Sequence, residues 1–287
     1  MNSAQGESDF AVLPGAGGLP KVSLAAPDGA QAEVYLQGAH VTSWKPAGGE
    51  ERLFLSATAE FRVGGSIRGG VPVAFPQFSE RGPLPKHGFA RRLPWEFLGA
   101  QSGTAAVTAK FRLRASDATR RLWPFAFETE LSVRVGGPRL EMTLRVTNPG
   151  DQALSFTGAV HTYLRVAEAQ TTVVEPLGGA RYLDSVTNSE HIQAEPALTF
   201  GTETDRVYFN APAKVMVREP SRVMEVAMAG FPDIVIWNPW TERGAALADL
   251  EPEGYRHMLC VEAAVVGTPV CVEPGAEWLG TQTLTAS

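Results

Sequence analysis

Apolar and polar residues alternate over many short segments of this chain. Between Arg139 and Thr147 every second residue, from Leu140 to Val146, is apolar and the others are polar. A period of two puts alternate side chains on opposite faces of a strand, so the segment is predicted to be a half-buried β-strand. The turn sequence Asn-Pro-Gly-Asp follows at 148–151. The same alternation predicts strands at Gln31–Leu36, Ala105–Leu113, Glu128–Val135, Leu154–Val166, Val215–Val217, Ile234–Trp237, Leu259–Ala264 and Thr281–Leu284.

Numerous short strands with turns between them predict an all-β fold, a large antiparallel β-sandwich. The 29 glycines and 21 prolines among 287 residues agree with frequent turns. No helix longer than about two turns is expected, and Arg52–Leu55 with Ala57–Phe61 is predicted to be one short helix or a loop. No linker or fixed-period repeat divides the chain. We therefore predict a single domain over residues 19–287, after a loose tail over residues 1–18.

Composition limits the classes of partner. Hydrophobic residues make up 44% and charged residues 20%, which is typical of a globular protein that buries a full core. The net charge of −6 argues against general nucleic-acid binding. The two cysteines, Cys260 and Cys271, form neither a disulfide framework nor a metal-ligand spacing, so no metal site is expected. No signal peptide or membrane-length apolar run is present, and we expect a cytoplasmic monomer.

One long segment, Phe61–Arg92, departs from the strand pattern. It is rich in Gly and Pro, and long loops in compact domains are often functional. It holds six Lys and Arg residues against Glu80 alone, a charge of +5 inside an acidic chain. Such a patch predicts a small anionic ligand, and the planar fork of arginine suits a phosphate. Each arginine taken singly is equally consistent with an ordinary surface charge.

The histidines differ in their context. His161 lies on the polar side of the alternating segment Leu154–Val166, together with Tyr163 and Arg165. A rigid strand position suits an acid/base group, but a histidine merely hydrogen-bonded on a solvated sheet face explains the spacing as well. His87 lies in the basic segment and could serve either function or structure. The other three histidines show no such context.

Two carboxylates stand in the same short pattern, Cys-Val-Glu. Glu262 interrupts an apolar run, where a carboxylate must be paired or belong to a site, and where burial would raise its pKa. Glu273 precedes Pro274-Gly275 and is expected at a hairpin end in water. Asp205 begins a predicted strand at Thr204–Tyr208 and could be a site residue or a cap. No nucleotide-binding glycine loop, zinc motif or nucleophile elbow is present, so no cofactor is expected.

Several motifs in order resemble the hexose-6-phosphate mutarotases, the glucose-6-phosphate 1-epimerase branch of the aldose 1-epimerase superfamily. The resemblance covers roughly residues 25–285. The segments that carry it are Ser66–Phe78, Leu84–Arg91, Phe156–Tyr163, Glu203–Tyr208, Val235–Trp240, Tyr255–Ala264 and Pro274–Gln282.

The resemblance implies a galactose-mutarotase-like β-sandwich that binds its sugar on a concave sheet. It implies that His161 is the acid acting on the ring oxygen and that Glu262 is the base acting on the anomeric hydroxyl. Further matched positions that would hold the sugar or its phosphate are Arg68, Gln77, Lys86, His87, Arg91 and Asp205, of which Lys86 stands at a variable position. The implied reaction exchanges the anomers of a hexose 6-phosphate. An epimerase of unphosphorylated aldoses and a non-catalytic carbohydrate-binding protein remain alternatives, as does a structural sandwich that binds a protein partner.

Overall fold

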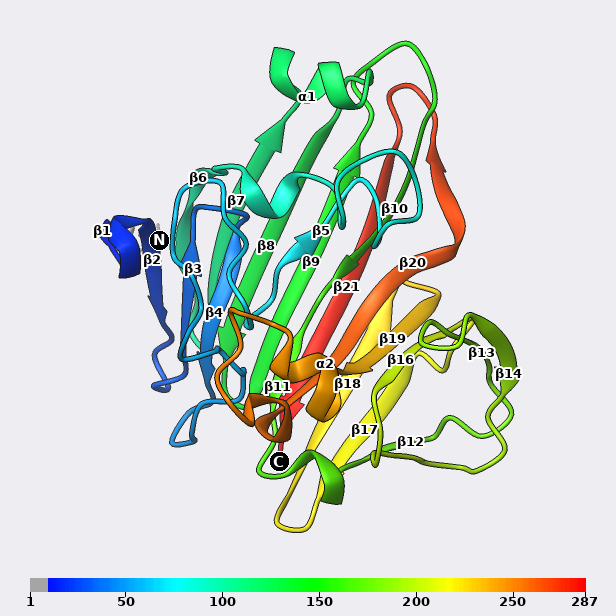
Figure 1. The fold of residues 1–287 in the computed structure, drawn as a ribbon. Coiled ribbons are helices and arrows are strands. Elements are labelled where there is room, and N and C mark those ends of the chain that lie inside the picture. The colour runs from blue at the N-terminus through cyan, green and yellow to red at the C-terminus, as the bar shows by residue number, and fades with distance from the viewer. Residues whose placement is uncertain (1–9) are drawn as a thin grey trace.

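The computed structural model describes residues 10–287, and nearly all of their regular structure is antiparallel β-strand (Figure 1). Among these residues the two α-helices are six residues each, α1 at Asp117–Leu122 and α2 at Trp240–Ala245. Single 3-10 turns lie at η1 (Ala16–Gly18), η2 (Ala90–Arg92), η3 (Ala169–Thr171) and η4 (Gly254–His257). No helix of this part of the chain is long and apolar enough to cross a membrane.

The strands form three sheets in which sheet neighbours run antiparallel. A four-stranded sheet has the order β1 (Val12–Pro14), β2 (Pro20–Ala25), β3 (Gln31–Tyr35), β4 (His40–Lys45). An eight-stranded sheet has the order β14 (Ser189–Ile192), β13 (Arg181–Asp184), β16 (Thr204–Tyr208), β19 (Asp233–Asn238), β20 (Met258–Val272), β10 (Leu154–Val160), β5 (Val73–Ala74), with β11 (Tyr163–Arg165) also paired to β20. A nine-stranded sheet has the order β15 (Leu198–Thr199), β12 (Val173–Glu175), β17 (Lys214–Glu219), β18 (Arg222–Ala229), β21 (Glu277–Ala286), β9 (Arg139–Thr147), β8 (Glu128–Gly136), β7 (Val107–Arg114), β6 (Glu96–Ser102).

One apolar core joins the three sheets. Its buried side chains run from Val22 to Ala286 and include Val34 of the four-stranded sheet, Val261 of the eight-stranded sheet and Leu144 of the nine-stranded sheet. Burial of alternate side chains between facing sheets is the driving force of a sandwich. The predicted all-β sandwich is therefore confirmed. The prediction of one domain over 19–287 is supported by this continuous core and stays a prediction.

Strand β20 divides the inside of the sandwich from the site. Leu259, Val261 and Ala263 point into the core. Cys260 and Glu262 point the other way and are also buried, with relative exposures of 0% and 1%. The outer face of β20 is thus shielded from water at Cys260 and Glu262, as the lining of a binding pocket can be.

Most predicted strands are found within a few residues of their expected ends, but β20 runs on to Val272, beyond the predicted end at Ala264, and one predicted strand is broken. The segment Leu154–Val166 forms two strands, β10 and β11, separated at His161 and Thr162. The hydroxyl of Thr162 donates to Gln282 in the core, while the N–H of His161 donates to the carbonyl of Pro72 at 3.0 Å. The break therefore places His161 in a bend between strands rather than in mid-strand.

The structure decides one open expectation and differs from the sequence analysis at two other short segments. The stretch Arg52–Phe61 is a loop, one of its two predicted forms, and Leu53 and Leu55 make isolated β-bridges to Leu164 and Gly69. Helix α1 was not expected; its N-cap Ser116 and Thr119 form a reciprocal capping box. Part of the predicted loose tail is strand β1, which pairs with β2. The rest of that tail, residues 1–9, lies outside the described residues.

Candidate functional site

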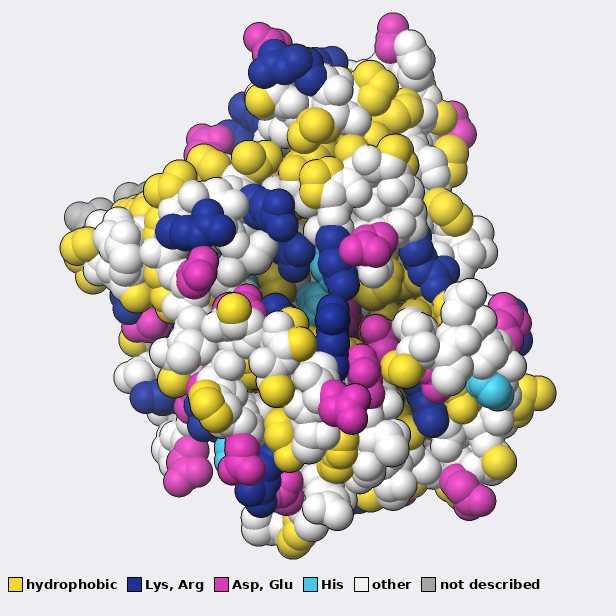
Figure 2. Space-filling model, in the orientation of Figure 1, with side chains coloured by type: hydrophobic (Ala, Val, Ile, Leu, Met, Phe, Trp, Pro, Cys, Tyr) yellow, Lys and Arg dark blue, Asp and Glu magenta, His cyan; other side chains and the backbone are white. Residues whose placement is uncertain are grey.

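A row of side chains crosses the outer face of the eight-stranded sheet. The cross-strand partners follow in the order Asp205 of β16, Trp237 of β19, Cys260 of β20 and Tyr163 of β11. Side chains directly opposite one another on neighbouring strands touch. The row therefore joins four strands that are up to 97 residues apart in the chain (260 minus 163). Figure 2 shows a hollow around which Lys and Arg side chains gather, with His side chains visible inside it.

His161 and Glu262 meet beside this row. Glu262 lies opposite Val235 of β19. It is two residues beyond Cys260 in β20, so the two side chains point to the same face of the strand. The Nε2 atom of His161 is 3.3 Å from Oε1 of Glu262, and the two side chains are 8% and 2% exposed. The alternation placed His161 opposite the core, and this is confirmed. The face is not solvated, however, because the basic segment covers it.

Burial sets the protonation of this pair. Burial raises the pKa of Glu262 well above 4.5, and the nearby charge of Asp205 raises it further. Burial lowers the pKa of His161 well below 6.5, and the charges of Arg91 and Arg68 act in the same direction. The pair therefore favours a protonated carboxyl beside a neutral imidazole, with one proton between them. Nδ1 of His161 and Oε2 of Glu262 are buried without a hydrogen-bond partner among the described residues.

An aromatic wall holds the ring of His161. Tyr163 stacks on it with ring centroids 4.9 Å apart and planes 11° apart, and Trp237 meets both rings edge-on. The Tyr163 hydroxyl accepts a hydrogen bond from Nη1 of Arg68 at 3.1 Å. Nε and Nη2 of Arg68 donate to Oδ1 of Asp249 at 3.1 and 2.9 Å. Arg68 is thus brought into the site as predicted, but its charge is paired.

His87 is held in the site by its own backbone. Its φ is +63°, a left-handed conformation, and its N–H donates to the carbonyl of Ser79. The N–H of Ser79 donates in turn to Nδ1 of His87 at 3.2 Å. Burial and the charge of Arg91 lower the pKa of His87 to about 3. A neutral ring whose Nδ1 accepts carries its proton on Nε2, so His87 is a hydrogen-bond donor. Its ring centroid is 5.2 Å from that of His161.

Arg91 is the unpaired charge of the site. Its Nη2 donates to the backbone carbonyl of Lys86 at 3.0 Å, its Nε has no partner, and no carboxylate among residues 10–287 forms an ion pair with it. Burial lowers the pKa of Arg91 to about 10, and Tyr163 opposes this effect. A desolvated guanidinium without a counter-ion favours an anionic ligand.

Two further predicted residues flank the hollow. Burial raises the pKa of Asp205, against the effect of a hydrogen bond from Ser185 and of the charge of Lys86. Lys86 itself is exposed on the basic segment. Both side chains act electrostatically on Glu262, Asp205 raising its pKa and Lys86 lowering it. The structure therefore brings both of them to the neighbourhood of the His161–Glu262 pair.

Gln77 differs from the other predicted residues. Its Nε2 donates to the carbonyls of Ser79 and Leu84, both at 3.0 Å, and its Oε1 accepts from the N–H of Leu84 at 2.9 Å. Both amide hydrogens are used, so Gln77 has none left for a sugar. Its side chain closes the loop that carries Lys86 and His87.

Three contributors were missed in the sequence. Asp249 pairs with Arg68 from a loop after α2, and nothing in its local sequence marks it. Trp237 was seen only as part of a predicted strand and a motif, although its edge faces His161. His40 is fully buried and its Nε2 lies 2.7 Å from the carbonyl of Gly69, next to Arg68. Burial lowers the pKa of His40 to about 4, so this neutral ring supports the loop.

The structure also brings together three side chains of types that can ligate a metal. The ligand atoms of His161, Cys260 and Glu262 all lie within 4.8 Å of one another, and all three side chains are buried. No local motif indicates this grouping, because His161 and Cys260 are 99 residues apart (260 minus 161) and belong to no metal-binding motif. Cys271 is exposed, and neither cysteine forms a disulfide. The other glutamate of the Cys-Val-Glu pair, Glu273, is exposed as predicted.

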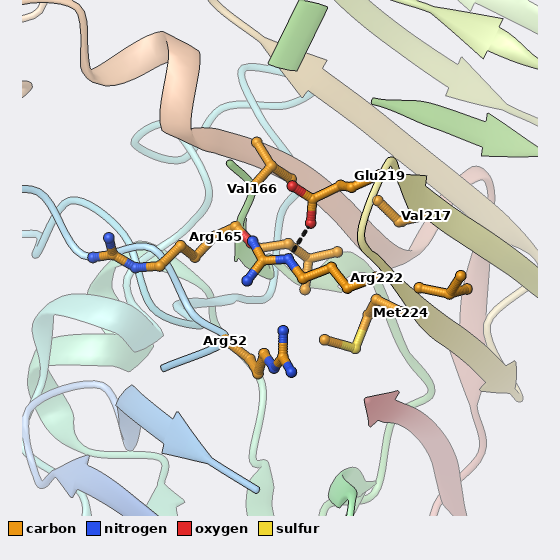
Figure 3. A pocket seen from close by; sticks show the side chains of 9 residues that line it. Arg52, Arg165, Val166, Val217, Glu219, Arg222 and Met224 are labelled. Atoms are coloured by element: carbon orange, nitrogen blue, oxygen red, sulfur yellow. Dashed lines mark hydrogen bonds and ion pairs between the residues drawn. The ribbon is translucent and has the colours of Figure 1, made fainter. Parts of the chain in front are cut away.

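Two other cavities contain neither His161 nor Glu262. One is lined by Arg52, Arg165, Arg222 and Glu219 among others, and Glu219 pairs with Arg222 (Figure 3). Its interior of about 10 Å³ is room for a single water and not for a sugar. The second, of about 470 Å³, is lined by Arg62, Arg92, Ser66 and Asp249 among others, and adjoins the site through the Asp249–Arg68 pair.

Comparison with known proteins agrees with this geometry. The family model described as aldose 1-epimerase matches residues 20–285. The chain belongs to the aldose 1-epimerase family. It is 38% identical over 281 residues to a protein of Cenchrus ciliaris named "Putative glucose-6-phosphate 1-epimerase", covering 94% of this chain and 85% of that one. A protein of Salmonella typhimurium with the same name is 34% identical, covering 83% of this chain and 81% of that one.

Solved structures give the same fold. A crystal structure titled as a putative mutarotase from Salmonella typhimurium superposes with a TM-score of 0.87 at 30% identity, covering 97% of each chain. A galactose mutarotase related enzyme from Lactobacillus acidophilus superposes with a TM-score of 0.73 at 17% identity, covering 92% of this chain and 96% of that one. The second likeness concerns the fold alone. The galactose-mutarotase-like sandwich is therefore confirmed.

Proposed function

We propose that this chain interconverts the α and β anomers of a hexose 6-phosphate, with glucose 6-phosphate as the reference substrate. Membership of the aldose 1-epimerase family supports the epimerase chemistry, and the names of two relatives support the phosphorylated substrate. In this chain the phosphate rests on one observation, the half-buried guanidinium of Arg91, whose Nε is buried and which has no carboxylate partner beside the His161–Glu262 pair.

The chemistry needs one proton donor and one proton acceptor. Glu262 removes the proton of the anomeric hydroxyl while His161 protonates the ring oxygen, and the bond between C1 and the ring oxygen breaks. Rotation about C1–C2 and reclosure then give either anomer. Both oxygens are bonded to C1, so two groups whose polar atoms are 3.3 Å apart can reach them together.

A single shared proton is sufficient for the cycle. Ring opening starts from a Glu262 carboxylate and a His161 imidazolium, and it ends with a protonated Glu262 and a neutral His161. This final state, with a protonated Glu262 and a neutral His161, is the one that burial favours in the free protein. Reclosure returns the proton to the histidine, and neither redox equivalent nor net proton is consumed.

The substrate phosphate would help to charge His161. The charges of Arg91 and Arg68 contribute to the low pKa of this histidine. A phosphate bound at Arg91 offsets that positive field and raises the pKa of His161 toward the range of a general acid. Free hexoses lack this effect, so binding and protonation both favour the phosphorylated sugar.

We assign the remaining residues by what their side chains have left to offer. Arg91 and Lys86 bind the phosphate, His87 donates from Nε2 to a sugar oxygen, and Asp205 accepts from a sugar hydroxyl. Arg68 keeps Tyr163 stacked on His161 and uses its free N–H groups for the ligand. Gln77 is a positioning residue for the loop.

The test compares the anomer-exchange rates of glucose 6-phosphate, glucose and galactose, measured by magnetisation transfer between the anomeric protons. Each rate is corrected for uncatalysed exchange in buffer. We expect catalysis of glucose 6-phosphate to exceed that of both free sugars. Faster exchange of a free sugar would favour an unphosphorylated aldose, and no catalysis of any of them would favour a non-catalytic carbohydrate-binding protein.

We further propose that the protein acts as a cytoplasmic monomer.

A further inference from the structure

The proposed reaction makes no use of Cys260, although its side chain lies on the same face of β20 as Glu262. We propose that Cys260, His161 and Glu262 together form a binding site for a thiophilic divalent cation such as Zn²⁺, and that an ion bound there blocks the reaction. The binding part stands on the geometry of these three residues. The inhibitory part rests on the proposed function.

The geometry suits a small tetrahedral ion. The possible ligand atoms of the three side chains lie within 4.8 Å of one another. Nε2 of His161 and Oε1 of Glu262 are already 3.3 Å apart. Two ligands that bind zinc at roughly 2.0 Å with tetrahedral angles are about 3.3 Å apart, so this edge of the coordination shell is formed. A small movement of the sulfur would complete a three-ligand set and leave the fourth position to water.

Unsatisfied polar atoms give a second argument. Oε2 of Glu262 is buried without a partner, although Glu262 is only 1% exposed. Nδ1 of His161 is also buried and unpartnered. A buried polar group without a partner carries a desolvation cost, which a bound cation would relieve at the carboxylate. Strand pairing places Cys260 between Trp237 and Tyr163, on the same face of β20 as Glu262.

The charges around the cluster permit a cation. Arg68 is neutralised by Asp249, and His87 is an uncharged ring. Zn²⁺ would replace the thiol proton of Cys260 and the carboxyl proton of Glu262, so the net charge of the pocket would stay the same. Arg91 and the more exposed Lys86 are the remaining positive charges near Glu262, and both weaken the affinity. Release of two protons makes binding stronger as the pH rises.

The donor set also selects the ion. Thiolate and imidazole favour Zn²⁺ and other soft or borderline ions, whereas Mg²⁺ prefers oxygen ligands in octahedral geometry. We expect Zn²⁺ and Cd²⁺ to bind and Mg²⁺ to have no effect. This distinguishes the cluster from a general attraction of cations to an acidic protein.

Direct binding is measured on the full chain by titration with Cd²⁺, following the ultraviolet thiolate-to-metal charge-transfer band. The chain has two cysteines, so the Cys271→Ser variant retains Cys260 alone. We expect the band in the unaltered protein and in folded Cys271→Ser. We expect it to be lost in Cys260→Ser and Cys260→Ala. A band absent from Cys271→Ser overturns the proposal, even if the Cys260 variants fail to fold.

Inhibition is measured as the Zn²⁺ concentration that halves the anomer-exchange rate, each variant relative to its own rate without metal. Loss of a residue that only hydrogen-bonds to a metal ligand costs about 10–100-fold in metal affinity. Loss of the ligand Cys260 itself in Cys260→Ser should therefore raise the inhibitory Zn²⁺ concentration at least tenfold. Cys271→Ser should not change it, and glucose 6-phosphate should protect. Equal inhibition of both cysteine variants would overturn the proposal. A Cd²⁺ band that needs Cys260 in a protein without exchange activity would keep the metal site and reject the proposed function.

Discussion

Nε2 of His161 lies 3.3 Å from Oε1 of Glu262, inside a site where both side chains are almost wholly buried. Because each group depends on the other for its proton, we expect Glu262→Gln and His161→Gln each to lower the anomer-exchange rate by about 10²–10⁴-fold. The double variant should lose little more than the worse single variant, because the two residues act as one unit. The rates are measured by magnetisation transfer, above exchange in buffer.

Retained binding makes this result specific. Inorganic phosphate should still raise the melting temperature of both single variants, because Arg91 is unchanged. Single variants that bind phosphate and exchange anomers at the unaltered rate would remove His161 and Glu262 from the reaction.

Arg91 and Arg92 form a matched pair for testing the phosphate. Arg91 lies in the site without a carboxylate partner, whereas the next residue, Arg92, is exposed and donates to Ser66. A hydrogen bond to a charged group is worth about 1.5–3 kcal/mol, so Arg91→Gln should lower kcat/KM for glucose 6-phosphate roughly 10–100-fold. Arg92→Gln should leave it within about twofold, since solvated charges contribute little.

The readout is the ratio of kcat/KM for glucose 6-phosphate to that for glucose. Loss of a phosphate contact lowers this ratio, whereas damage to the proton-transfer pair lowers both values. An unchanged ratio in Arg91→Gln would move the phosphate elsewhere, with the cavity lined by Arg62 and Arg92 as the next place to look.

The strands could be predicted because their signal is local. The alternation in Arg139–Thr147 is set by the residues of that segment, and β9 has the predicted bounds. The break at His161 could not be predicted in this way. It depends on Thr162 reaching Gln282, which lies 120 residues away in the sequence.

Much of the site was visible for a different reason. The basic segment showed its excess charge, and motif resemblance pointed to His161 and Glu262. Charge counting alone could not tell a paired arginine from an unpaired one. Asp249 neutralises Arg68, while Arg91 has no such partner, and this difference appears only when distant loops meet.

Gln77 should act on the loop rather than on the sugar. Its amide makes three hydrogen bonds to the backbone of Ser79 and Leu84. Gln77→Leu leaves these backbone groups to find other partners, and we expect a loss of about 1–3 kcal/mol in the free energy of unfolding. Because the same loop carries His87, KM should rise while kcat changes less. Urea unfolding and steady-state kinetics check this, and a large fall in kcat at unchanged stability would instead indicate direct contact with the substrate.

Glu262 should make stability depend on pH in a defined direction. Burial holds its pKa in the folded protein well above 4.5, so the folded state keeps a proton that the unfolded chain releases. The stabilising contribution of the neutral carboxyl is complete below about pH 4.5 and is lost as the pH rises toward the folded pKa. Glutamine mimics the neutral carboxyl at every pH. We therefore compare the free energy of unfolding of Glu262→Gln with that of the unaltered protein by urea unfolding. The difference in favour of Glu262→Gln should grow as the pH rises from 4.5 to 8. The control is Glu273→Gln, which changes the exposed glutamate of the other Cys-Val-Glu pattern and should show no such growth. If the difference for Glu262→Gln does not change with pH, the Glu262 carboxyl is ionised in the folded protein.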